Sequence, residues 1–257
     1  MVRLSIYNEK GGVGKTTLTV LVASYLAYGR GRRVCVVDFD YPTYHLWQLR
    51  ESELSILADP RSPLAAWLRE NPSEAEPYTV IRAHPGAGGV FSPREVFALE
   101  RGIDPLRYDV LLYDFPGRFT PDEPVSLLAA NGGLDFVGIP MDTDVQSRRS
   151  ALVVADALAG EGVPLVLFWN RVSRSEALGS RERFLRGAAP FRERGLRVLD
   201  EGVRDLRKLS RESSEMAFIR STLCFPERHL RRWSPALIPF LEQLTDLLPN
   251  PQSTTRA

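Results

Sequence analysis

The sequence predicts an α/β fold built on a doubly wound, mostly parallel sheet flanked by helices. Two observations support this: short, almost wholly apolar runs recur along the chain, and each is followed by a turn signal or a polar helical stretch. Near-continuous apolar runs are typical of strands buried on both faces, and alternating strands and helices favour parallel pairing. The runs are 33–38, 110–114 and 164–170, with 134–140 as a less uniformly apolar fourth.

The first 28 residues predict a strand, a glycine-rich loop and a helix, in that order. Residues 3–8 alternate as a strand does, and Gly11, Gly12 and Gly14 follow directly. From Thr16 to Tyr28 the apolar residues recur with helical spacing, which indicates a helix with one buried face.

The rest of the chain gives weaker signals. Residues 41–107 hold several prolines and glycines, and we expect peripheral helices and loops there. The last helical stretch, 237–248, carries two acidic residues and no basic one, so we expect it to pack on the sheet and not on anionic lipid. Because no linker divides the chain, we expect one domain over residues 1–248 and a frayed tail over 249–257.

Composition and charge exclude several classes of protein. A content of 44% hydrophobic and 25% charged residues excludes a disordered or collagen-like chain. No apolar run approaches the roughly 20 residues that a membrane-spanning helix needs, and two cysteines cannot form a disulfide framework. With no secretory leader, we expect a cytoplasmic protein. The net charge of +1 leaves only a local patch to attract nucleic acid or a membrane.

Residues 10–17, with the sequence KGGVGKTT, predict a site for a nucleotide triphosphate. A helix start favours an anion, and glycines let the chain curl so that successive N–H groups point into one concavity. Lys15 can reach the β- and γ-phosphates, and the Thr16 hydroxyl can bind Mg²⁺. The usual pattern G-x-x-x-x-G-K-[ST] is missed at its first position, which is Glu9. The alternative is a glycine-rich turn with two solvated lysines. The expected ATP-binding residues are Gly11, Gly12, Val13, Gly14, Lys15, Thr16 and Thr17.

This loop resembles the deviant Walker A motif of the ParA/MinD family of P-loop ATPases, and Lys10 matches the family's signature lysine. Three later stretches resemble the family's other motifs in the same order. The first is VVDFDYP at 36–42, similar to D-x-D-P-Q but with Tyr41 inserted before the proline. The second is LLYDFPG at 111–117, similar to a Walker B strand with a D-x-P-G switch. The third is LFWNR at 167–171, similar to the strand whose Asn reads adenine.

A narrower resemblance is carried by residues 20–26, 36–42 and 220–223. These stretches look like the ParA-like ATPases of Bacteroidetes conjugative transposons. That resemblance implies a role in DNA transfer or in maintaining a mobile element.

The family resemblance implies Mg²⁺-dependent ATP hydrolysis by a homodimer that closes around ATP. Lys10 would reach the phosphates held by the partner subunit and, with Lys15, stabilise the charge that develops during transfer. Asp40 would orient the attacking water, and Asn170 would read adenine. Thr16 would bind the metal directly, while Asp38 and Asp114 would hold its waters. The alternative for each acid is that it caps the following helix or turn.

The charge of the C-terminal part bears on which macromolecule such an ATPase would bind. Residues 171–232 hold 16 basic and nine acidic side chains. The resemblance suggests non-specific binding of duplex DNA by the ATP-bound dimer, through arginine contacts to phosphate. The alternative is a solvated surface of Arg–Glu pairs, in a nucleotide-switched protein that positions a protein cargo and does not bind DNA. A stimulating protein partner is expected in either case, and a membrane partner is not.

Overall fold

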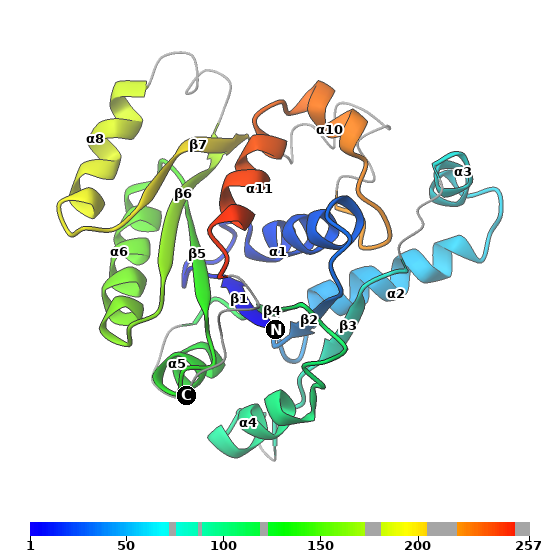
Figure 1. Ribbon diagram of the computed structural model, residues 1–257, viewed down its shortest axis with the longest axis horizontal. Coiled ribbons are helices and arrows are strands. Elements are labelled where there is room, and N and C mark those ends of the chain that lie inside the picture. Colours follow the sequence, from blue (N-terminus) through cyan, green and yellow to red (C-terminus); the bar gives the residue numbers. More distant parts are fainter. Residues whose placement is uncertain (72–75, 87–88, 119–122, 173–180, 205–219, 250–257) are drawn as a thin grey trace.

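The computed structural model describes residues 1–71, 76–86, 89–118, 123–172, 181–204 and 220–249. Its strands form one seven-stranded sheet in the order β3-β2-β4-β1-β5-β6-β7, and all the paired strands are parallel (Figure 1). The strands are β1 (Val2–Ile6), β2 (Val34–Asp38), β3 (Thr79–Arg82), β4 (Val110–Asp114), β5 (Phe136–Met141), β6 (Leu165–Val172) and β7 (Val198–Arg204). The predicted α/β class with a parallel sheet is confirmed.

Helices cover both faces of the sheet, as Figure 1 shows. On one face lie α1 (Lys15–Ser24), the π-helical turn η1 (Tyr25–Gly29), α2 (His45–Leu57), α10 (Glu227–Trp233) and α11 (Leu237–Asp246). On the other face lie α4 (Pro93–Gly102), α5 (Pro124–Ala130), α6 (Val145–Gly160) and α8 (Arg181–Arg192). The short α3 (Pro63–Glu70) follows α2. The fold is therefore doubly wound, as predicted.

Strand β2 shows why the apolar runs are continuous. Val34 and Val36 belong to the core on the α1 side, while Cys35 and Val37 belong to the core on the α6 side. Because both faces are covered, every position along the strand is apolar until Asp38.

Two strands were not predicted. The expectation of only helices and loops over 41–107 is wrong, because β3 lies in this region and pairs with β2 at the edge of the sheet. Its four residues, TVIR, are all half-buried, so they lack the apolar run of a central strand. Strand β7, at the opposite edge, was also missed. The predicted helix over 16–28 begins at Lys15 and changes to the π-helical turn after Ser24.

The last helix packs on the sheet, as predicted. In α11, Phe240 is fully buried, and its ring centroid lies 4.8 Å from that of Phe168 in β6. Leu241 and Leu244 are buried beside it. None of the described helices is both long and apolar enough to cross a membrane. The expected tail lies outside the described residues from position 250 onward.

The predicted nucleotide site, at residues 10–17, follows β1, where the strand order changes direction. From β1 the chain crosses to β2, two places away on one side, and after β4 it crosses to β5 on the other side of β1. In open parallel sheets such a switch point, at the carboxyl ends of the strands, is where ligands bind.

Candidate functional site

The loop between β1 and α1 has the conformation that an anion site needs. Gly12 and Gly14 have φ values of 74° and 98°, which glycine adopts without steric cost. Gly14 is the N-cap of α1, and no side chain caps the helix start. The first N–H groups of α1 are therefore left for a ligand, in the field of the helix dipole.

Lys15 is held inside this loop. Its side chain is buried, and Nζ donates a hydrogen bond of 3.1 Å to the Lys10 carbonyl. Burial lowers the pKa of the ammonium group, and the nearby Asp114 and Asp40 oppose this effect. Gly117 lies opposite: a Cβ there would stand 3.0 Å from Lys15 Nζ and 2.9 Å from the Glu9 carbonyl oxygen. The segment after β4 therefore closes directly on the loop, and only glycine fits at this position.

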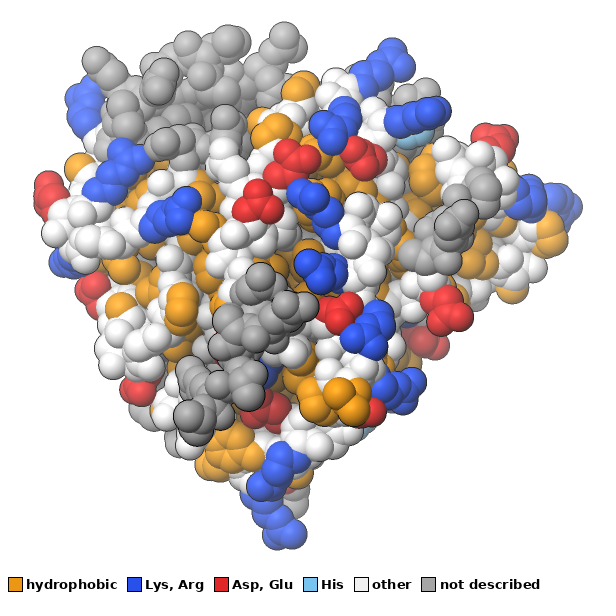
Figure 2. Space-filling model, in the orientation of Figure 1, with side chains coloured by type: hydrophobic (Ala, Val, Ile, Leu, Met, Phe, Trp, Pro, Cys, Tyr) orange, Lys and Arg blue, Asp and Glu red, His pale blue; other side chains and the backbone are white. Residues whose placement is uncertain are grey.

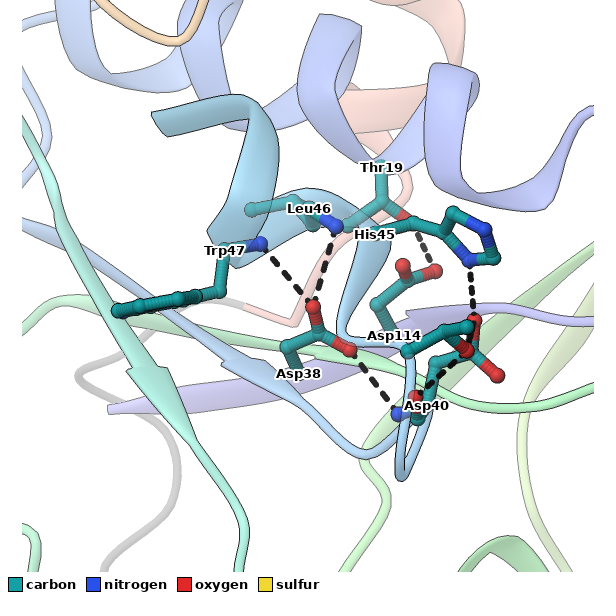
Figure 3. A network of polar contacts seen from close by, with 8 residues as sticks. Thr19, Asp38, Asp40, His45, Leu46, Trp47 and Asp114 are labelled. Carbon is teal, nitrogen blue, oxygen red and sulfur yellow. Dashed lines mark hydrogen bonds and ion pairs between the residues drawn. The ribbon is translucent and has the colours of Figure 1, made fainter. Parts of the chain in front are cut away.

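Asp38 and Asp114 end neighbouring strands and are aligned in register (Figure 3). Asp38 Oδ2 accepts hydrogen bonds from the N–H groups of Leu46 (3.1 Å) and Trp47 (3.0 Å), at the start of α2. Its Oδ1 accepts one from Asp40 N–H at 2.9 Å. Asp38 thus caps the start of α2, which is the role predicted from the sequence as the alternative to holding metal-bound water. Burial raises its pKa, and these backbone donors oppose that effect.

Asp114 is the less satisfied of the two carboxyls. It is fully buried, and its Oδ1 accepts a hydrogen bond of 3.4 Å from the Thr19 hydroxyl. Its Oδ2 has no hydrogen-bond partner among the described residues. Burial, strengthened by the charge of Asp38, raises its pKa to about 7, against the opposing effects of Thr16 and Lys15. A buried carboxylate oxygen without a donor fits a position beside a cation or its bound water.

These residues fit Mg²⁺ held jointly with a substrate. Among the described residues, no group of three His, Cys, Asp or Glu side chains could hold a metal alone. Mg²⁺ keeps several waters and takes one or two protein oxygens together with substrate phosphates, so such a group is not required. Thr16, half-buried in the first turn of α1, and the orphaned Asp114 oxygen are the available partners.

Asp40 is half-buried, and one of its carboxylate oxygens contacts two side chains. Oδ2 lies 2.5 Å from His45 Nδ1 and 3.3 Å from the Thr43 hydroxyl (Figure 3). His45 was not predicted as part of the site, because an isolated histidine in an irregular region gives no sequence signal.

Comparison with known proteins supports the fold described above. Residues 4–55 match the family model described as the CobQ/CobB/MinD/ParA nucleotide binding domain. A chain of the MinC:MinD cell division protein complex of Aquifex aeolicus is similar in structure, with a TM-score of 0.66, 16% identity and 96% of each chain covered.

Two further solved structures have the same fold. Pyrococcus furiosus cell division ATPase MinD has a TM-score of 0.62 at 18% identity, covering 96% of this chain and 99% of that one. A putative plasmid partition protein from Borrelia burgdorferi, bound to AMPPNP, has a TM-score of 0.58 at 15% identity, covering 94% of this chain and 99% of that one. No curated protein matches the chain in sequence.

The chain has the fold of the MinD/ParA-type P-loop ATPases.

The structure also shows where Lys10 lies. Its Nζ forms an ion pair of 3.2 Å with Asp144, the N-cap of α6 in the same chain. Its backbone N–H donates to Asn8 Oδ1 at 3.0 Å. The lysine that was predicted to act in trans is thus paired within its own subunit.

Asn170 lies against the loop. Its Nδ2 donates a hydrogen bond of 2.7 Å to the Val13 carbonyl, and a Cβ on Gly14 would stand 2.7 Å from the same nitrogen. Asn170 was predicted to end its strand, but β6 continues to Val172. Its role in reading adenine stays a prediction.

Proposed function

We propose that this chain is a Mg²⁺-dependent ATPase that closes as a homodimer around ATP. One observation carries the proposal: an uncapped, glycine-curled helix start with a buried lysine lies beside a buried carboxylate whose Oδ2 has no donor among the described residues. The loop supplies N–H groups and positive charge for the phosphates, and the carboxylate supplies negative charge for the metal.

Each residue then has a task in hydrolysis. The loop N–H groups and Lys15 bind the phosphate tail. The Thr16 hydroxyl binds Mg²⁺, and Asp114 accepts hydrogen bonds from its waters, with Asp38 beside it. Mg²⁺, when bound, neutralises charge on the β- and γ-phosphates. Asp40 orients the attacking water, and Lys10 leaves Asp144 to reach the phosphates of the partner subunit.

Nucleotide binding tests the core of this proposal. Isothermal titration with ADP and AMPPNP should show Mg²⁺-dependent binding by the wild type, and Lys15→Ala should lose most of the affinity. Arg61→Ala, a change at a 91% exposed side chain, is the matched control and should bind normally. A wild type that binds neither nucleotide would refute the proposal.

We propose further that the ATP-bound dimer binds duplex DNA non-specifically, in partitioning or conjugative transfer of a mobile element. The excess of basic residues over 171–232 supports this. Much of that stretch lies outside the described residues, 173–180 and 205–219 in particular.

A nucleotide-switched protein that positions a cargo is the second candidate, and two observations favour it. In the described part, Arg231 pairs with Glu227 at 2.7 Å, and Arg194 lies 3.6 Å from Asp156. Basic and acidic side chains are also interspersed on the face in Figure 2. Such pairing reduces the charge available to phosphates.

Filter binding of duplex DNA separates the two candidates. DNA retention that needs ATP and falls steeply with salt supports partitioning or transfer. Absence of ATP-dependent retention at low salt removes the DNA role and leaves the cargo role. In both cases a stimulating protein should raise the hydrolysis rate.

A further inference from the structure

The residue after Asn170 has an unusual backbone conformation. Arg171 has a φ of 60°, in the left-handed region that non-glycine residues rarely adopt. The pairing of β6 with β7 is irregular at the same point, between Trp169 and Val172. Irregular pairing of this kind redirects side chains, and strained residues persist where the surrounding structure holds them, often at functional sites.

The redirected side chain reaches the phosphate loop. A Cβ on Gly12 would stand 3.8 Å from Arg171 Nη1, and one on Gly14 would stand 4.0 Å from Arg171 Nε. The hydrogen bond from Asn170 to the Val13 carbonyl lies between these two contacts in sequence. The end of β6 therefore lies along three successive residues of the loop, and it brings a guanidinium group to them.

We propose that Arg171 is a further phosphate-binding cation of the nucleotide site, supplied in cis from β6. Lys15 comes from inside the loop and Lys10 is expected from the partner subunit, so Arg171 adds a contact from a third direction. A guanidinium group offers parallel N–H donors that match phosphate oxygens, which an ammonium group does not. The proposal rests on the nucleotide-binding function proposed above. Arg171 ends the LFWNR stretch at 167–171, in which only Asn170 was given a role.

The strained φ makes a discriminating pair of variants available. Arg171→Ala removes the guanidinium and keeps the strain, whereas Arg171→Gly removes both. We expect both variants to bind ADP roughly tenfold or more weakly, because each loses a charged hydrogen bond. We expect Arg171→Gly to melt about 2–4 °C above Arg171→Ala, because glycine relieves the left-handed conformation. Arg171→Lys should lie between Arg171→Ala and the wild type in affinity.

The measurements are ADP and AMPPNP titration and thermal unfolding without nucleotide. ADP is the deciding ligand, because the chain is expected to be monomeric with it, so an effect on ADP acts in cis. Lys15→Ala should lose binding, and Arg61→Ala should match the wild type.

Two results would overturn the assignment while leaving the proposed function intact. One is a wild type that binds ADP and an Arg171→Ala variant that binds it equally well. The other is a loss seen only with AMPPNP, because the assignment places the guanidinium group on phosphates that ADP also carries. A purely structural arginine would lower the melting temperature and leave the affinity of the folded protein unchanged. Failure of the wild type to bind either nucleotide would refute the function itself.

Discussion

The buried carboxyl of Asp114 makes the free protein sensitive to pH. A pKa raised from 3.8 to about 7 means that the folded state binds the proton more tightly than the unfolded chain. The contribution of this group to stability is therefore fully present below pH 3.8 and is lost as the pH rises through about 7. Fully ionised, the group costs about 4 kcal/mol, of which roughly 2–3 kcal/mol is lost between pH 5 and 8.

Asp114→Asn tests this value. The variant lacks the titrating group, so its stability relative to wild type should rise by roughly 2–3 kcal/mol from pH 5 to pH 8. Urea unfolding of both proteins at the two pH values, without nucleotide or Mg²⁺, measures the change. Any constant cost of the Asn side chain cancels in the comparison. An equal stability difference at pH 5 and pH 8 would show that Asp114 is ionised without penalty and that our account of its burial is wrong.

Three other predictions concern single substitutions. Lys10→Ala should bind ATP but lose hydrolysis, and light scattering with ATP and ADP should show ATP-dependent dimers of the wild type; normal hydrolysis by the variant would disprove the trans-lysine role. Gly14→Ala should abolish nucleotide binding in a titration, because the residue has a φ of 98° and its Cβ would stand 2.7 Å from Asn170 Nδ2; retained affinity would mean that the loop adapts. Phe240→Ala should cost about 3–5 kcal/mol in urea unfolding, because a fully buried ring leaves a cavity; a cost below about 1 kcal/mol would contradict the packing of α11.

The central strands could be predicted from the sequence because burial on both faces leaves a continuous apolar run. The edge strand β3 could not, because its four half-buried residues carry no such run and lie among prolines and glycines. Strand β3 forms because it pairs with β2, and this long-range contact is not encoded in local sequence patterns.

The glycine-rich loop between β1 and α1 could be predicted because the phosphate-binding chemistry proposed for it requires certain residues at a fixed spacing. Arg171 could not be assigned, because its approach depends on a positive φ and on irregular strand pairing. His45 is similar: it meets Asp40 through the turn that leads into α2. The pairing of Lys10 with Asp144 joins positions 134 apart, and no motif describes it.

Helix α11 also has a consequence for the order of events during synthesis. Its Leu244 packs beside Gly138 together with Ile6 from β1 and Phe168 from β6, so it covers the strand that leads into the phosphate loop. A nascent chain on the ribosome cannot bury this surface until residues 237–246 have emerged. Until then the apolar face of the sheet is available to chaperones.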